Sequence, residues 1–459
     1  MSNTAEQSGA YNHDTRFQGT DKQMDRMVRV LKVRRRARTN LLSGFVDISN
    51  FKYREVGQID FFDLWEREQT RLTPFCLDDE NRCVIFVHTP VETDLTQVHP
   101  FFYEAQRRHA EVLYAVPYDL LNQIADAACD PAADEDVIFL HSTGRCGSTL
   151  LCKLLGDLPG VQSVSEPDFF SQIVNLREHA TDDRDAELAR IIRSCTRLLY
   201  AHLIGRRPDC KKVVIKLRGV CISAADVFVA GLPAAKNMFL YRNALETVDS
   251  FIGAIYGVPL VRWAGKFGLD AKLLRLIAAV SPMKKNPQAL APLLKDPHYE
   301  KNTPEDLVAF LTVAWLSKMD RALNLTLSRE GLFEALVRYE DLTAAPMPIV
   351  AQLSRALCLP AVDDLSRERM QVTLSKNSQE GTALASTGKT WMSPGQIQLM
   401  RKMLQLHNQI RDEKYRIPGT LSAREAVLEE GSSRWGRVIE SAWPLSVDGE
   451  APRASKVAG

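Results

Sequence analysis

The stretch FLHSTGRCGSTLLCKLL, Phe139 to Leu155, decides what fold this sequence can adopt. It joins a short apolar run to a run of leucines at helical spacing through a loop that contains Gly144 and Gly147. Glycine permits backbone angles that turn consecutive N–H groups inward, and the dipole of a following helix favours negative charge at its N-terminus. The stretch therefore predicts a strand, an anion-binding loop and a helix, in that order.

The loop lacks the residue that ATP- and GTP-binding loops need. In those loops a lysine follows the second glycine, whereas here Ser148 occupies that position and Thr149 follows it. Positive charge comes instead from Arg145 inside the loop, and we expect its neighbour Cys146 to fill a small-residue position. A guanidinium can bind two oxygens of one phosphate or sulfate group. The loop thus predicts an anion site without the usual lysine.

Composition and charge limit the alternatives. The chain has 459 residues, enough for about two or three domains, and 45% of them are hydrophobic. Lys and Arg total 58 against 57 Asp and Glu, so overall charge favours neither nucleic acid nor a membrane surface. We expect no membrane span and a cytoplasmic protein, because there is no apolar run of about 18 residues and no apolar signal-peptide core. Nine cysteines and nine histidines show no zinc-ligand spacing, which predicts free thiols and no metal site.

The chain before the loop divides into two parts. Residues 1–45 are polar, with a basic run at Lys32–Arg38, and we expect a solvated tail there, with a nuclear or anionic-lipid address as the alternative. Residues 46–132 form an accessory α+β segment with a predicted strand at 83–89 and a predicted helix over 100–116. An acidic, proline-containing stretch ends this segment.

The remainder alternates short β-rich runs with helical patterns. The β-rich runs are residues 137–141, 213–217, 237–241 and 335–339. Strands separated by helices imply crossover connections and a parallel sheet covered on both faces. We therefore expect an α/β domain over residues 133–420, of the P-loop NTPase-like class with a parallel sheet flanked by helices. Residues 421–459 are expected to be a disordered tail.

Three further stretches follow the loop in a fixed order: KVVIKLRG (212–219), LYRNALETVDS (240–250) and VRYEDL (337–342). Together with GRCGSTLL, they resemble the sulfotransferase family, most closely its protein-tyrosine and carbohydrate branches. The resemblance covers about residues 135 to 395. In that family the loop binds the 5′-phosphosulfate of 3′-phosphoadenosine-5′-phosphosulfate (PAPS). The missing lysine is normal there, because no γ-phosphate or magnesium has to be held.

The resemblance also implies which residues bind the nucleotide. Arg242 and Ser250 lie eight residues apart, like the arginine and serine that grip the 3′-phosphate in the family. Tyr339 matches a tyrosine near the adenine, with a buried strand-end tyrosine as the alternative. Lys389, in TGKTW, matches a basic residue that closes over the 3′-phosphate.

Lys216 matches the family's lysine at the end of a strand, which contacts the bridging oxygen and the transferring sulfuryl group. Arg145 would help to stabilise the same charge. The cytosolic branch of the family takes its catalytic histidine from the residues after this lysine, but here Leu217 and Arg218 follow. A general base must therefore come from another part of the chain.

Glu166 is the candidate base. It follows Arg145 by 21 residues, the interval at which protein-tyrosine sulfotransferases carry their proposed base glutamate. A carboxylate there could accept the acceptor's proton if its surroundings raise its pKa. The alternative is a loop carboxylate that caps a helix beginning near Pro167. A histidine such as His141 is the reserve candidate.

The sequence thus predicts a PAPS-dependent sulfotransferase that moves a sulfuryl group to a hydroxyl or amine acceptor and releases PAP, the desulfonated nucleotide, without a metal. Its expected partners are PAPS, PAP and an unidentified acceptor. Two alternatives stay open. One is a P-loop nucleotide kinase, disfavoured by the missing lysine and by the lack of a clear strand-end aspartate for magnesium. The other is a non-catalytic nucleotide-binding member of the fold.

Overall fold

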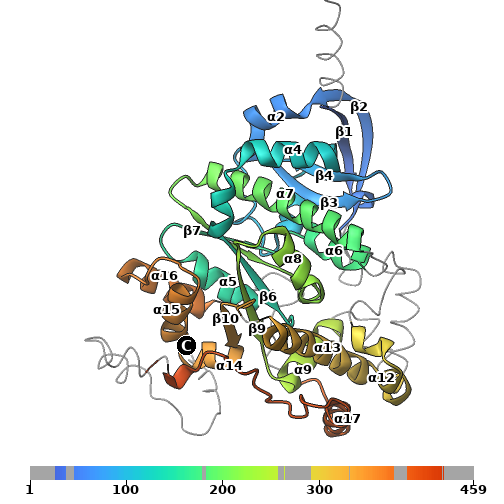
Figure 1. The fold of residues 1–459 in the computed structure, drawn as a ribbon, viewed down its shortest axis with the longest axis vertical. Coiled ribbons are helices and arrows are strands. Elements are labelled where there is room, and N and C mark those ends of the chain that lie inside the picture. Colours follow the sequence, from blue (N-terminus) through green and yellow to red (C-terminus); the bar gives the residue numbers. More distant parts are fainter. Residues whose placement is uncertain are drawn as a thin grey trace, which may run out of the picture.

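The computed structural model describes residues 26–37, 46–177, 182–256, 263, 291–329, 331–376, 390–425 and 427. Within them the chain forms two five-stranded sheets with helices packed between and around them (Figure 1). One sheet comes from the first part of the chain and is antiparallel, and the other follows the loop and is parallel. No helix among the described residues has the length and apolar character that crossing a membrane needs.

The parallel sheet has the strand order β10-β9-β6-β8-β7. Its strands are β6 (Val137–Ser142), β7 (Val161–Ser165), β8 (Lys212–Lys216), β9 (Lys236–Tyr241) and β10 (Ala335–Arg338). The four predicted β-rich runs are therefore strands, and the predicted α/β class is confirmed. The chain runs from β6 to one edge, returns to β8 and then crosses to β9, so the strand order reverses at β6. Open α/β sheets bind ligands outside the carboxyl ends of their strands at such a point.

Helices cover both faces of this sheet because alternate strand residues face opposite sides. Phe139 packs with α6, α7 and α8, whereas Ile138 and Leu140 pack with α5 and α15. The helices of this part of the chain are α5 (Ser148–Gly156), α6 (Phe169–Arg177), α7 (Asp182–Arg206), α8 (Ala225–Gly231), α9 (Ala244–Tyr256), α12 (Pro297–Asn302), α13 (Leu307–Ser328), α14 (Tyr339–Ala344), α15 (Pro346–Ala356), α16 (Asp364–Ser375) and α17 (Pro394–Leu404).

The antiparallel sheet has the order β2-β1-β5-β4-β3. Its elements are β1 (Met27–Arg36), β2 (Phe51–Asp60), α2 (Phe61–Glu68), β3 (Leu72–Asp78), β4 (Cys83–His88), α3 (Phe102–His109), β5 (Val112–Pro117) and α4 (Tyr118–Ala128). Short 3₁₀ turns lie at Ile48–Asn50, Gln69–Arg71, Pro131–Asp136, Cys221–Ala224 and Pro292–Lys295. One continuous hydrophobic cluster joins Phe86 of this sheet to Phe170 of α6 and Leu188 of α7. Helices α6 and α7 thus contribute to a core that both sheets share.

Two predictions for the N-terminal part are wrong. Residues 27–36 are not a tail but strand β1, which lies between β2 and β5. Val28 and Leu31 are buried while the charged residues between and after them are exposed, so the basic run marks the solvent side of a strand. The helix expected over 100–116 ends at His109, because the buried apolar run from Val112 forms strand β5 in the middle of the sheet.

The C-terminal boundary also needs correction. Thr420 is buried and forms a parallel bridge with Leu336 of β10, and the backbone N–H of Leu421 donates to the Leu336 carbonyl at 2.9 Å. The N–H of Ala423 donates to the Asp341 carboxylate at 3.0 Å. Residues 421–425 therefore belong to the folded domain rather than to the expected tail. The remainder of that tail, apart from residue 427, lies outside the described residues.

Candidate nucleotide and sulfuryl site

The loop after β6 has the predicted strand, loop and helix geometry. Gly144 and Gly147 both have φ of 77°, in the left-handed region that glycine adopts without strain. Arg145, between them, has φ of 54°. Gly147 is the N-cap of α5 and no side chain caps that helix. The first N–H groups of α5 and its dipole thus face the carboxyl edge of the sheet, as an anion site requires.

Tyr339 and Arg242 close one side of this loop. A Cβ atom added to Gly147 would lie 2.3 Å from Cε2 of Tyr339, so the tyrosine ring occupies the space that a side chain would need. The Arg242 guanidinium lies over the same ring, 4.6 Å from its centroid. Three predicted nucleotide-binding residues are therefore stacked together, although they come from the ends of β9 and β10 and from the loop.

Arg145 and Ser250 join the same group. The Arg145 Nε donates to the Ser250 Oγ at 2.9 Å. Burial lowers the pKa of Arg145, and the positive charge of Arg242 lowers it further. The Glu246 carboxylate, 2.5 Å from Arg242 and half exposed, offsets part of this repulsion. Two guanidiniums close enough to repel each other, beside a helix N-terminus, form a site suited to a phosphate or sulfate group.

Four charged side chains form a row, called the charged row below, along the carboxyl ends of β7 and β8: Lys216, Glu166, Arg218 and Asp168. Lys216 forms an ion pair with Glu166, whose backbone N–H donates to the Lys216 carbonyl at 2.8 Å. The Nε of Arg218 lies 3.4 Å from the Glu166 carboxylate and 2.9 Å from the carboxylate of Asp168. The predicted catalytic lysine and the predicted base are thus in direct contact, and Arg218 holds the base from the other side.

The pKa of Glu166 shifts in the direction opposite to the one expected for a base. Burial raises it, but the positive charges of Lys216 and Arg218 outweigh burial and hold the pKa below its ordinary value. Asp168 differs, because burial raises its pKa to about 6 although Arg218 opposes the rise. Glu166 is therefore an ionised carboxylate at neutral pH whose basicity is held down by its two cationic neighbours.

Residues of the chain before the loop also contact this row. The ring of Phe101 lies 5.7 Å from the Lys216 ammonium, and the ring of Tyr103 lies 4.6 Å from the Arg218 guanidinium. The backbone N–H of Val46 donates to the Asp168 carboxylate at 2.9 Å. The segment that the sequence left without a role therefore supplies one wall of the site.

Several other predicted residues have clear positions. Ser148 and Thr149 are buried in the first turn of α5. Cys146 is also buried, and its Sγ lies 3.4 Å from the Leu240 carbonyl, so it packs against the sheet. All nine cysteines are free thiols. Lys389 lies outside the described residues.

His141 is unsuited to act as the reserve base. It is fully buried on β6, next to the Phe228 and Phe333 rings, and it is hydrogen-bonded to Asn237 at 3.2 Å. Burial lowers its pKa to about 4. An acceptor bound at the edge of the sheet therefore cannot reach it.

Sequence reasoning missed two residues that support the site. The Asp249 carboxylate, next to Ser250, accepts the N–H groups of Trp391 and Met392 at 2.7 and 2.8 Å, which holds that later segment on α9. The Lys318 ammonium donates to the carbonyl of Thr143, the first loop residue, at 3.1 Å. The only signal for Lys318 is a single lysine within the apolar run LTVAWLSKM of α13.

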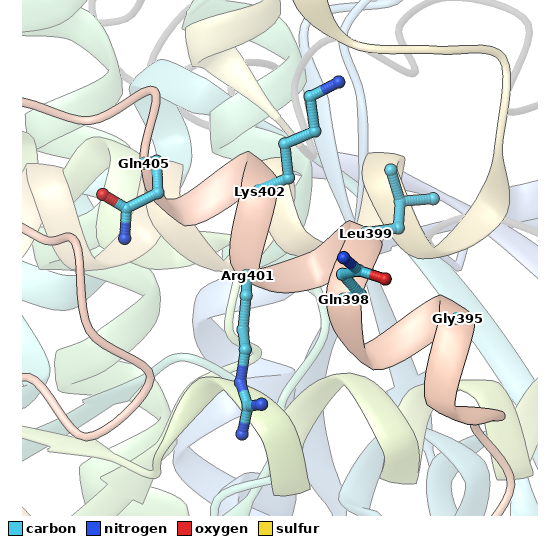
Figure 2. A pocket seen from close by; sticks show the side chains of 6 residues that line it. All are labelled: Gly395, Gln398, Leu399, Arg401, Lys402 and Gln405. Carbon is cyan, nitrogen blue, oxygen red and sulfur yellow. The ribbon is translucent and has the colours of Figure 1, made fainter.

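A separate open hollow of about 460 Å³ lies beside α17 (Figure 2). It is lined by Gly395, Gln398, Leu399, Arg401, Lys402 and Gln405, which come from this helix and the residue that follows it. No other element contributes a lining residue, and Arg401 is in an ion pair with Glu413 at 2.8 Å. The hollow thus lacks the converging groups that the sheet edge has. In the described part of the chain, no three His, Cys, Asp or Glu side chains gather as metal ligands do.

The chain is weakly similar to several solved structures. No protein-family model matches the chain, and no curated protein matches it. Sulfotransferase STF9 from Mycobacterium avium is 11% identical with a TM-score of 0.34, covering 60% of this chain and 77% of that one. Sulfotransferase STF1 from Mycobacterium tuberculosis H37Rv is 15% identical with a TM-score of 0.29, covering 62% and 81%. The sulfotransferase domain of the Synechococcus PCC 7002 olefin synthase is 15% identical with a TM-score of 0.28, covering 58% and 93%. The function therefore has to be inferred from the site itself.

Proposed function

We propose that this protein is a PAPS-dependent sulfotransferase, which moves a sulfuryl group from PAPS to a hydroxyl or amine acceptor and releases PAP. The observation that carries this proposal is the meeting of Arg145 and Arg242 beside the N-terminus of α5, with Ser250 and Tyr339 in contact with them. Two arginines and a hydroxyl suit a ligand with more than one phosphate group. The position after Gly147 carries no lysine for a γ-phosphate.

The nucleotide is assigned to this group of residues. The loop from Gly144 to Thr149 would hold the 5′-phosphosulfate through its N–H groups and hydroxyls. Arg242 and Ser250 would hold the 3′-phosphate, and the Tyr339 ring would lie beside the adenine. Lys389 remains a prediction for the same phosphate.

The transfer itself is assigned to the charged row. The acceptor oxygen attacks sulfur, the bond from sulfur to the bridging oxygen breaks, and that oxygen keeps the electron pair on the PAP that leaves. Lys216 would stabilise the charge that develops on the bridging oxygen, since a positioned cation acts most strongly where charge appears in the transition state. The acceptor's proton would go to Glu166.

The ion pair of Lys216 with Glu166 links these two roles. While Lys216 neutralises Glu166, the carboxylate is a weak base. Once Lys216 turns to the leaving oxygen, Glu166 keeps only Arg218 as a cationic neighbour and its basicity rises. The base would thus become effective when the sulfuryl donor is bound. Arg218 and Asp168 would hold Glu166 in place.

A direct test separates this function from that of a kinase. We expect calorimetric titration to give micromolar affinity for PAP and much weaker binding of ATP with magnesium. Incubation with PAPS and a metabolite extract should then yield a product heavier by one sulfate group in mass spectrometry. Tight binding of ATP with magnesium but not of PAP would contradict the proposal. Binding of PAP without transfer to any acceptor would instead favour a non-catalytic nucleotide-binding protein.

A further inference from the structure

Lys318 is a buried cation next to the loop that neither the sequence motifs nor the proposed chemistry uses. It lies on α13 and is 7% exposed. Its ammonium donates to the Thr143 carbonyl at 3.1 Å and lies 5.4 Å from the centroid of the Phe251 ring. Phe251 in turn lies within 3.3 Å of the position that a Cβ on Gly144 would take. Lys318 therefore contacts the first residue of the loop directly and contacts the Phe251 ring that packs against Gly144.

No carboxylate pairs with Lys318 among the described residues, and charged residues near it in sequence on α13, like Asp249 on α9, have other partners. On α13 itself, Asp320 is paired with His407 and Arg321 with Asp226 of α8. On α9, Asp249 accepts the N–H groups of Trp391 and Met392. Within the described ranges, the loop thiol of Cys146 is the one ionisable group that shifts the Lys318 pKa, and it favours the charged form.

A buried ammonium that contacts only one carbonyl and one aromatic ring among the described residues lowers the stability of the folded protein, because its charge has lost its hydration. The loop peptide between Thr143 and Gly144, whose carbonyl accepts from Lys318, is nevertheless tightly packed. A Cβ on Gly219 would lie 2.8 Å from the Gly144 nitrogen and 2.9 Å from the Thr143 carbonyl carbon, so the peptide that Lys318 contacts is packed on its other side as well. Such an uncompensated charge is favourable once an anion lies in the loop.

We infer that Lys318 is a positioning residue of the anion site, which supplies from α13 the positive charge that a lysine after Gly147 supplies in ATP-binding loops. It acts through the Thr143 carbonyl and through its field on the phosphosulfate or phosphate in the loop. This inference rests on the proposed function only in naming PAPS and PAP as the anions.

The charge of Lys318 should make anion binding depend on pH. Burial lowers the pKa of Lys318 from 10.5 to about 8, so its protonated form dominates at pH 7 and is a minority at pH 9. If the protonated form is the one that binds, PAP affinity falls about tenfold between pH 7 and pH 9, and binding near pH 8 takes up protons.

The free energy of unfolding should change with pH in the opposite direction to PAP affinity: it should rise as pH rises. Because the pKa of Lys318 is lower in the folded than in the unfolded chain, the unfolded chain binds more protons between about pH 8 and 10.5. The contribution of Lys318 to stability is therefore unfavourable at neutral pH and becomes less so as pH rises through that window. Lys318→Met should accordingly raise the melting temperature at pH 7 while it weakens PAP binding. A lysine that merely supports the fold would lower both.

The experiment compares PAP titrations of the wild-type protein, Lys318→Met, Lys318→Arg and the control Lys402→Met at pH 7 and pH 9. Lys402 is exposed on α17 and is not part of the site, so its variant should behave as wild type. We expect Lys318→Met to bind PAP about tenfold or more weakly at pH 7 and to lose the pH dependence. Lys318→Arg, whose charge persists at pH 9, should keep affinity at both pH values.

Equal PAP affinity of Lys318→Met and wild type at both pH values would overturn the inference. So would a wild-type affinity that does not change with pH, a measurement that needs no variant. If the wild-type protein binds pyrophosphate or ATP with magnesium but not PAP, the proposed function fails, and the same comparison is made with that anion. If it binds none of the three, both the function and the role of Lys318 are wrong.

Discussion

Arg145 and Glu166 share an unusual backbone conformation. In the described part of the chain four non-glycine residues have positive φ, and Arg145 at 54° and Glu166 at 58° are two of them. This conformation costs a non-glycine residue on the order of 1 kcal/mol, and it persists where surrounding contacts impose it. Here the Ser250 hydroxyl and the Lys216 backbone carbonyl hold the two residues. A tertiary contact thus holds the side chain of Arg145, and another holds the backbone of Glu166.

Arg242 gives the first residue-scale prediction. Arg242→Ala removes one charge-assisted contact with the nucleotide and should weaken PAP binding by roughly ten- to a hundredfold, or about 1.5–3 kcal/mol. Isothermal titration measures this change. Arg401→Ala is a matched control, because Arg401 also pairs with a carboxylate but lies in the hollow beside α17. Equal affinity for adenosine phosphosulfate with and without the 3′-phosphate would contradict the assignment.

Lys216 should matter for turnover more than for binding. Loss of a cation aimed at developing charge costs about a hundred- to a thousandfold in turnover. Lys216→Ala should therefore lose transfer activity while PAP affinity stays within a few-fold of wild type. Steady-state rates and PAP titrations on the same preparation measure the two effects. If PAP binding disappears with activity, Lys216 serves binding or folding instead.

Glu166→Gln keeps size and hydrogen bonding but removes basicity. We expect turnover to fall by about a hundred- to ten-thousandfold, with a smaller defect for acidic acceptors such as nitrophenols. PAP binding should become tighter, because the variant removes the negative charge that now neutralises Lys216. Transfer assays with acceptors of graded acidity measure the effect. Normal turnover on the natural acceptor would exclude Glu166 as the base.

At the scale of elements, α9 joins the site to a distant part of the chain. Asp249 accepts two N–H groups from Trp391 and Met392, and a Cβ on Gly253 would lie 2.4 Å from the Trp391 ring nitrogen. The segment before α17 is thus packed directly onto the helix that carries Ser250. The side chain next to Ser250 therefore fixes a segment that begins 142 positions later in the chain.

Asp249→Ala leaves these two partly buried N–H groups without their acceptor. It should lower the free energy of unfolding by about 1–3 kcal/mol, whereas Asp249→Asn, which retains a carbonyl oxygen, should lose less. Chemical denaturation measures both. Equal stability of the alanine and asparagine variants would show that the acceptor oxygen is unimportant.

At the scale of the molecule, the N-terminal sheet is part of the core. Helices α6 and α7 lie beside both sheets (Figure 1), and they contribute to a hydrophobic cluster that contains residues of both. Removal of residues 1–132 would expose their apolar faces to water and would also remove Phe101 and Tyr103 from the charged row. Exposed apolar area of this kind destabilises a domain by about 25 cal/mol per Å².

A fragment of residues 133–425 should accordingly aggregate or lack cooperative unfolding, in contrast to the full chain. Size-exclusion chromatography and thermal unfolding followed by circular dichroism provide the comparison. A monomeric fragment that unfolds cooperatively and binds PAP would show that the parallel-sheet part is an independent domain.

The sequence by itself determined four of the five strands of the parallel sheet, its α/β class and the loop; it did not predict β7. Strands buried on both faces leave continuous apolar runs, and the glycines of the loop leave a local pattern, so both are visible over a few residues. Prediction from the sequence was wrong at β1, where basic side chains on the solvent face made a strand look like a polar tail. It was also wrong at β5, where an apolar strand closely follows a helix and was predicted as part of it.

Only the tertiary structure decided which charges meet. The pairing of Lys216 with Glu166, the contact of Arg145 with Ser250 and the hydrogen bond of Lys318 to Thr143 join residues between 50 and 175 positions apart. A pKa depends on burial and on charges within a few ångströms, and neither is a property of the local sequence. The loop and the three stretches after it were enough to predict most residues of the candidate site. The packing of α9, α13 and the N-terminal sheet around the strand ends determined the ion pairs and pKa shifts of those residues.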